Sequence, residues 1–128
     1  MRKITIVVIG EHFAGKSKTI NKYLKTKFGM DERQHKFTYK KHEGYILSQS
    51  REEREDFEND ISRYSKYDIL VLATRPRSEE KSLLKDTEAK LKKMGFKFFL
   101  VQIIKDQKEN FYKEKANEIM AIISKQCV

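Results

Sequence analysis

The stretch that most constrains this chain is residues 10–17, which follow directly on a run of apolar residues at 4–9. Its residues are G-E-H-F-A-G-K-S, and they fit the spacing G-x-x-x-x-G-K-[ST]. The two glycines let the backbone wrap closely around an anion, and a helix beginning near Lys16 would point its unpaired N–H groups at that anion. The Lys16 ammonium could reach terminal phosphates, and the Ser17 hydroxyl could ligate Mg²⁺. The stretch therefore predicts a phosphate-binding loop between a buried strand and a helix.

Elsewhere the chain alternates apolar runs with segments of helical periodicity. Apolar runs predict buried strands at 4–9, 68–74 and 98–104. Apolar residues at helical spacing predict helices over 16–28, 51–66 and 110–126, together with a helix from Ser78, as its N-cap, to Gly95. Phe37 and Tyr39 alternate with polar residues, and His42-Glu-Gly44 is typical of the turn of a β-hairpin that is completed by residues 45–48.

This order of elements predicts an α/β protein with one domain over residues 1–128. We expect three layers, α/β/α, around a five-stranded, mostly parallel sheet that contains one antiparallel hairpin strand. Ligands of such sheets bind at the carboxyl ends of the strands, which is where residues 10–17 lie.

The charge balance indicates the class of partner, and the single cysteine and the lack of a membrane-length run indicate the compartment. Lys and Arg number 28 against 19 Asp and Glu, which gives a formal charge of +9 and favours anionic partners. The basic residues are spread along the chain, so we expect a nucleotide rather than a nucleic acid. Cys127 alone excludes an internal disulfide, and no stretch is long enough to span a membrane, so we expect a cytoplasmic protein.

With these motifs in place, the chain resembles P-loop NTPases, and among them the Ras-like and dynamin-related small GTPases, over nearly its whole length. The resemblance implies Mg²⁺ and GTP or GDP as ligands, with ATP not excluded. The phosphate loop is intact, whereas the family's D-x-x-G box is replaced: Ser48 takes the place of its aspartate and Arg51 that of its glycine. Family members have a glutamine that orients the attacking water, and Glu52 stands near that position in this chain. Thr38 could correspond to the family's threonine that closes on Mg²⁺.

The base-reading N-K-x-D box is also reduced. Residues 103–106 are Ile-Ile-Lys-Asp, so Asp106 remains as the acceptor for a guanine ring, while Lys105 is displaced by one position. The bulk of His12 near the γ-phosphate would hinder in-line hydrolysis. The resemblance thus implies a nucleotide-binding switch with slow or absent hydrolysis, which would change its binding of a protein partner through switch segments at 30–36 and 48–58.

The predicted site combines the loop with these outlying residues. Thr38 and Glu52 are the candidates for catalysis, and Ser17 is the candidate metal ligand. The predicted nucleotide contacts are Gly10, Glu11, His12, Phe13, Ala14, Gly15, Lys16, Ser17, Lys18, Lys105 and Asp106.

Two other functions stay open on the sequence. A small nucleotide kinase or ATPase would clamp phosphates with Arg54, Arg75 or Arg77, the last two following the strand that we expect beside the phosphate-loop strand. A non-catalytic, GTPase-like subunit would instead bind a protein partner through its surfaces. The sequence leaves the oligomeric state open, and His12, His35 and His42 lack the spacing of zinc ligands.

Overall fold

The computed structural model describes residues 2–11, 14–50, 52 and 61–127. Within these residues, five strands form one sheet in the order β2-β3-β4-β1-β5. β1 (Ile4–Ile9) lies in the middle of the parallel part, between β4 (Ile69–Thr74) and β5 (Lys97–Gln102). β3 (His42–Ser50) pairs in parallel with β4, and β2 (Lys36–Tyr39) is antiparallel to β3. The predicted mixed sheet, mostly parallel with one antiparallel pair, is confirmed.

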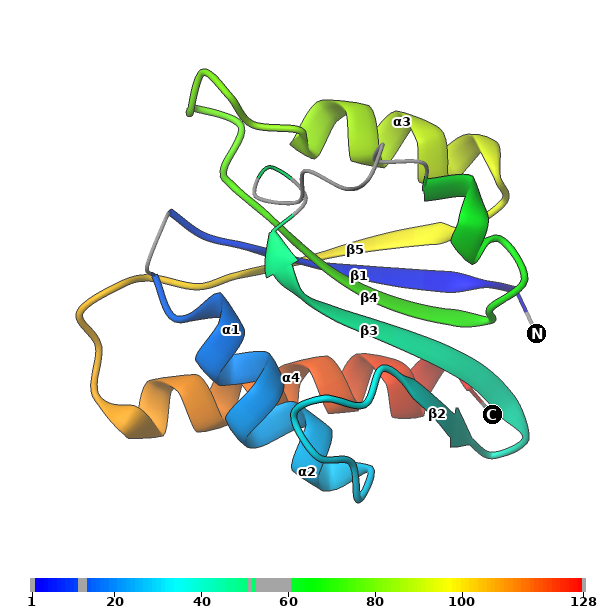
Figure 1. Cartoon of the computed structure of the whole chain (residues 1–128), viewed down its shortest axis with the longest axis horizontal. Coiled ribbons are helices and arrows are strands. Elements are labelled where there is room, and N and C mark those ends of the chain that lie inside the picture. Colours follow the sequence, from blue (N-terminus) through cyan, green and yellow to red (C-terminus); the bar gives the residue numbers. More distant parts are fainter. Residues whose placement is uncertain (1, 12–13, 51, 53–60, 128) are drawn as a thin grey trace.

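Helices cover both faces of this sheet, which gives the three predicted layers (Figure 1). On one face lie α4 (Glu109–Gln126) and a continuous helical stretch made of α1 (Lys16–Lys18), a π-helical segment (Thr19–Leu24) and α2 (Lys25–Lys27). On the other face lie α3 (Leu84–Lys93) and a 3₁₀ turn, Ile61–Tyr64.

The central strands are apolar along their whole length because both of their faces are covered. Every residue of β1 and of β4 is buried. Alternate side chains point to opposite layers: Ile6 and Val71 pack with α4, whereas Val7 and Leu72 pack with α3. The apolar runs that predicted these strands are therefore the two-sided core.

The first and last predicted helices are confirmed within a residue or two. The stretch 16–27 ends two residues before Gly29, whose φ of 71° takes the chain out of the helical direction. In α4 one stripe of residues at helical spacing is buried: Tyr112, Ala116, Ile119 and Ile123.

The hairpin is confirmed, but its turn was predicted in the wrong place. The turn is Lys40–Lys41, with φ values of 46° and 69°, as a two-residue hairpin loop of this kind requires. Gly44 lies within β3 opposite Phe37, and a Cβ on it would come within 2.2 Å of the Phe37 ring. The glycine therefore makes room for an aromatic side chain.

The helix expected from Ser78 also begins later than predicted, at Leu84. Residues 75–83 form a loop in which the Ser82 hydroxyl donates to the Arg75 carbonyl (2.9 Å) and accepts from the Leu84 N–H (3.1 Å). Ser82, not Ser78, thus lies at the helix start. Of the helix predicted over 51–66, positions 51 and 53–60 lie outside the described residues.

Among helices formed by the described residues, none has both the length and the apolar character needed to cross a lipid bilayer.

Candidate functional site

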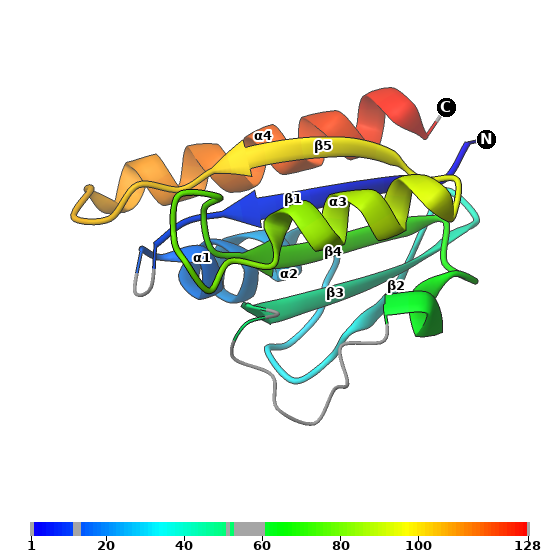
Figure 2. The same cartoon turned by 90° about the horizontal axis from the view of Figure 1, so that it is seen from above.

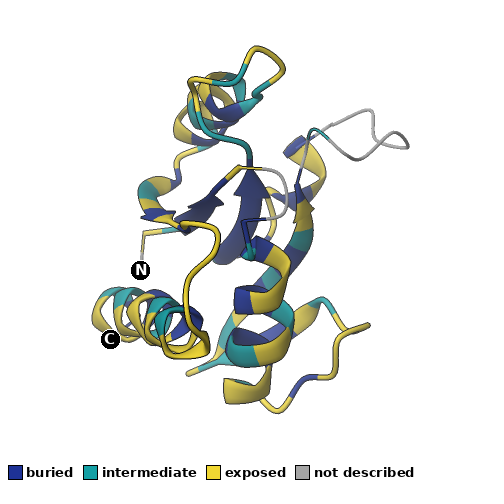
Figure 3. Ribbon diagram, turned by 90° about the vertical axis from the view of Figure 1, so that its left-hand side faces the viewer, coloured by how far each residue is buried: buried dark blue, intermediate teal, exposed yellow. Residues whose placement is uncertain are grey.

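The loops that follow β1, β4 and β5 gather at one edge of the sheet, at the left of Figure 1 and facing the viewer in Figure 3. The chain leaves β1 toward the layer that contains α1, and it leaves β4 toward the layer that contains α3. These neighbouring strands therefore form a topological switch point, which opens a crevice at the carboxyl ends of the strands.

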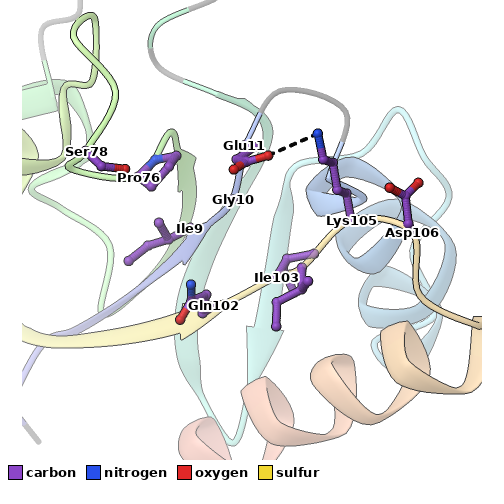
Figure 4. A pocket seen from close by; sticks show the side chains of 10 residues that line it. Ile9, Gly10, Glu11, Pro76, Ser78, Gln102, Ile103, Lys105 and Asp106 are labelled. Atoms are coloured by element: carbon purple, nitrogen blue, oxygen red, sulfur yellow. Dashed lines mark ion pairs between the residues drawn. The ribbon is translucent and has the colours of Figure 1, made fainter.

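A cleft of about 430 Å³ occupies this edge (Figure 4). Its lining comes from all three loops: Ile9, Gly10, Glu11, Pro76, Ser78, Gln102, Ile103, Ile104, Lys105 and Asp106. The first two residues of the predicted phosphate loop, Gly10 and Glu11, thus share one cavity with the predicted base contacts Lys105 and Asp106, whereas residues 14–18 are not part of its lining.

The two glycines of the loop occupy positions that other residues would not fit. Gly15 has a φ of 103°, and a Cβ on it would lie 2.5 Å from Cε1 of Tyr112. A Cβ on Gly10 would lie 3.0 Å from the Ile103 carbonyl oxygen, so the loop passes tightly beside the end of β5. The Gly10 N–H donates to the Thr74 carbonyl (3.2 Å), which fixes the loop to the end of β4.

Lys16 is held inside the loop. Lys16 as a whole is 6% exposed. Its ammonium donates to the carbonyl oxygens of Gly10 (2.5 Å) and Glu11 (2.9 Å), two residues that line the cleft. Burying an ammonium is costly unless it is hydrogen-bonded, and these carbonyls supply acceptors. A positive charge is therefore fixed beneath the rim of the cleft.

Ser17 fits the part of a metal ligand that the resemblance assigns to it. It is exposed in the first helical turn, and its hydroxyl oxygen accepts from Nδ2 of Asn21 (3.1 Å), which leaves a further lone pair. The described residues contain no cluster of three His, Cys, Asp or Glu side chains. Mg²⁺ commonly takes one or two protein oxygens together with phosphates and water, and the Ser17 hydroxyl is an oxygen of that kind.

Lys18 points away from the cleft, although the sequence places it in the predicted loop contacts. Its ammonium pairs with Glu109 (2.8 Å) and lies 5.2 Å from the centre of the Tyr112 ring. Hydrogen bonds from Lys18 and Tyr23 lower the pKa of Glu109 to about 2. Lys18 therefore links α1 to the start of α4.

The predicted base contacts, Lys105 and Asp106, line the opposite wall of the cleft. Lys105 pairs with Glu11 across the cleft, with Nζ and Oε2 3.3 Å apart (Figure 4). Both side chains are more than half exposed, so a ligand could displace this ion pair at little cost. Asp106 has a φ of 62°, an unusual conformation for a residue other than glycine and one that Asp tolerates better than most.

Tyr112 contacts both the loop after β1 and the loop after β5, and the sequence does not mark it as a site residue because it lies on the buried stripe of α4. Its ring packs on Gly15, its hydroxyl donates to the Ile104 carbonyl (3.2 Å), and it accepts from the Gln107 N–H (3.3 Å). Nothing in the periodicity distinguishes it from its core neighbours.

The loop after β4 contributes Pro76 and Ser78 to the cleft, not the arginines that flank the proline. Arg77 pairs with Glu88 of α3 (2.9 Å), and the Arg75 N–H donates to Glu52. Arg54 lies outside the described residues. The rule that ligands bind at carboxyl ends of strands would have found Pro76 and Ser78 from the sequence.

Glu52 has a different environment from that of a water-orienting side chain. Its two carboxylate oxygens accept from the backbone N–H groups of Arg75 (3.0 Å) and Leu83 (2.6 Å). The carboxylate thereby holds both ends of the loop between β4 and α3.

Thr38 is not brought to the site. It pairs with Glu43, next to Gly44, which pairs with Ile69 at the amino end of β4. The predicted phosphate loop follows the carboxyl end of β1, a full strand away. In this structure Thr38 therefore lies at the other end of the strands, because the hairpin turns there.

Several predicted residues lie outside the described part of the chain or away from the cleft. His12, Phe13 and Arg51 are not described, nor are most residues of the predicted switch segment 48–58. The other segment, 30–36, contributes no residue to the cleft lining. Ser48 is half-buried in β3.

No protein family, no curated protein and no solved structure matches this chain.

Proposed function

We propose that the chain binds a nucleoside triphosphate with Mg²⁺ through a P-loop formed by Gly10–Ser17, and that it prefers guanine. The observation that carries the proposal is the fixed Lys16 ammonium, which is bonded to two residues lining a cleft at the switch point of the sheet. A phosphate that enters there meets a buried positive charge and the start of a helical stretch.

The opposite wall of the cleft supports a base contact. Asp106 can accept hydrogen bonds from a ring N–H and an exocyclic amine, a donor pair that guanine offers. Lys105 can lie along the face of the base once it leaves Glu11. The cleft of about 430 Å³ lies within the size range of small-molecule sites.

We further propose that hydrolysis is slow. Both oxygens of Glu52 are bonded to backbone N–H groups, and Thr38 lies at the other end of the sheet. Neither is placed to orient a water molecule for in-line attack.

The test is Mg²⁺-dependent binding of fluorescent GTP, GDP and ATP analogues to the wild type and to Lys16→Ala. The matched control is Lys22→Ala, which removes an exposed lysine from the same helical stretch, where it pairs with Glu109 (3.5 Å). Circular dichroism melts would show that each variant is folded. We expect guanine nucleotides to bind, Lys16→Ala to weaken binding at least about tenfold, and Lys22→Ala to leave it unchanged.

Other outcomes would change the proposal. Equal weakening by both variants would mean that general attraction to a chain of charge +9 holds the nucleotide, and the P-loop assignment would fail. Stronger binding of ATP than of GTP would refute the guanine preference and favour an ATPase or kinase.

A further inference from the structure

The sheet ends on one side in β5, whose outer edge has no strand beside it in the described structure. The N–H groups of Lys97 and Ile103 donate to Lys3 and Ile9 at the two ends of β1 (2.8 and 2.7 Å). Alternate residues of a parallel strand bond to the same neighbour. The N–H and C=O groups of Phe98, Leu100 and Gln102 therefore face outward along this edge.

Side chains along the edge are apolar and incompletely covered. Leu100 is 48% exposed, and Phe98 and Phe99 are half-buried on opposite faces of the strand. Sheet edges in monomeric proteins are usually shortened or charged to prevent pairing. The other edge, β2, follows that rule, with four residues that begin at Lys36 and lead into Lys40–Lys41.

A flank of α4 extends this apolar surface. α4 runs below the sheet and on the outer side of β5 (Figures 1 and 2). One flank of α4 faces the first helical stretch, since Glu109 and Lys113 contact Tyr23. The opposite flank carries Phe111, Lys115, Ile122 and Gln126, and Gln126 accepts from the Lys97 ammonium (3.4 Å). We define the β5 edge surface as Phe98, Phe99, Leu100 and Gln102, with Phe111 and Ile122 of α4.

The charges around this surface indicate what would bind it. Lys97 begins β5, and Lys108 lies in the connection from β5 to α4; among the described residues neither forms an ion pair. Nearby Lys115 is paired with Glu118 (3.3 Å). The exposed Asp106, two residues before Lys108, offsets the charge at that end of β5, so a bound strand would meet uncompensated positive charge at Lys97. Acidic residues at both ends of the strand would meet this charge in either direction of pairing.

A second copy of the chain does not supply the missing carboxylates. Each copy has a formal charge of +9, so two copies repel each other. An antiparallel self-pairing about Leu100 would place each Lys97 opposite Ile103, which leaves both lysines without a carboxylate.

We propose that the β5 edge surface binds an extended strand of a partner protein, with apolar residues in its middle and acidic residues at its ends. The backbone of the strand would pair with Phe98, Leu100 and Gln102, and its apolar side chains would pack on the surface defined above. This proposal is independent of nucleotide binding.

The test uses the full chain and a synthetic peptide of alternating valine and threonine with two glutamates at each end. A matched peptide carries lysines in place of the glutamates, and a third carries prolines at alternate middle positions. Residue-resolved hydrogen exchange should show slowed exchange at the Leu100 and Gln102 amides with the acidic peptide. The Phe99 and Val101 amides, which face β1, should be protected with or without it.

Two variants separate a specific pairing from adhesion to an apolar patch. Leu100→Pro removes an outward N–H without removing a bond to β1, and it should abolish binding while β1 keeps its protection. Lys97→Glu should weaken the acidic peptide about two- to fivefold and strengthen the lysine-flanked peptide.

Equal protection by all three peptides, or none by the acidic peptide, would overturn the proposal. Protection without peptide that rises with protein concentration, together with a dimeric mass by light scattering, would assign the edge to a second copy and also overturn it.

Discussion

At the scale of single residues, Gly15 carries two constraints that can be separated by experiment. Gly29 has a similar positive φ, 71° against 103°, but a Cβ there would meet nothing within 4 Å. Gly29→Ala should therefore cost about 1–2 kcal/mol in the free energy of unfolding, from backbone strain alone. Gly15→Ala should cost roughly 1–3 kcal/mol more because the new methyl group meets the Tyr112 ring.

Urea unfolding of the two alanine variants measures this difference, and nucleotide titration of the same samples tests the loop. We expect Gly29→Ala to bind as the wild type does and Gly15→Ala to lose binding. Equal stabilities for the two variants would show that Tyr112 moves aside without cost, and that its ring is not fixed against the loop.

Lys25 is a buried cation outside the cleft. Its residue is fully buried, its ammonium donates to the Glu32 carbonyl (2.7 Å), and burial lowers its pKa. Between the folded and unfolded pKa values the unfolded chain binds more protons, so this residue makes stability rise as pH rises through that range. Lys25→Met should remove that rise, whereas Lys27→Met, at an exposed site, should keep it.

The measurement is urea unfolding at several pH values from neutral to about pH 10. The free-energy difference between the wild type and Lys25→Met should increase in favour of the wild type as pH rises. Parallel profiles would show that the Lys25 ammonium is as well solvated in the folded chain as in the unfolded one.

At the scale of elements, the positions of the strands were predictable and the turns were not, although β5 was wrongly predicted to be buried and is an edge strand in which Val101 alone is buried. Every residue in the runs that form β1 and β4 is apolar or small enough to be buried on either face of the sheet, so their composition alone identifies them as strands. As a glycine, Gly44 predicted a turn, but in the structure it makes room for the Phe37 ring. Phe37 lies opposite Gly44 only because of the register in which β2 and β3 pair. The helix begins after Ser82 and not after Ser78, because the Leu84 N–H donates to the Ser82 hydroxyl and the Leu83 N–H donates to Glu52, which is distant in sequence.

The hairpin turn is therefore a site where the chain is not optimal. Lys40 and Lys41 both adopt positive φ, which asparagine and glycine adopt at lower cost. The double variant Lys40→Asn, Lys41→Gly should stabilise the fold by about 1 kcal/mol. Thermal unfolding measures the gain, and a lower melting temperature would show that the lysine side chains contribute more than the backbone strain costs.

At the scale of the whole molecule, the candidate site joins segments that are far apart in sequence. The motif at residues 10–17 is visible in the sequence itself, and Asp106 was assigned only through the resemblance to the N-K-x-D box. Pro76 and Ser78 follow a predicted strand and could have been found by the rule that ligands bind at the carboxyl ends of strands, whereas Tyr112 could not, because its part in the site depends on how the loops meet at one edge.

This arrangement predicts how the molecule responds to a nucleotide. The cleft is lined by the loops after β1, β4 and β5, so a bound GTP analogue should slow hydrogen exchange in residues 10–17, 75–78 and 102–107 together. The hairpin around Thr38 should be unaffected, because it lies at the amino ends of the parallel strands, opposite the end where the cleft lies. The same experiment on Lys16→Ala should show no change at matched nucleotide concentration. Protection confined to residues 10–17 would mean that phosphate binds without a base contact, and protection at Thr38 would mean that the hairpin moves to the nucleotide as a switch.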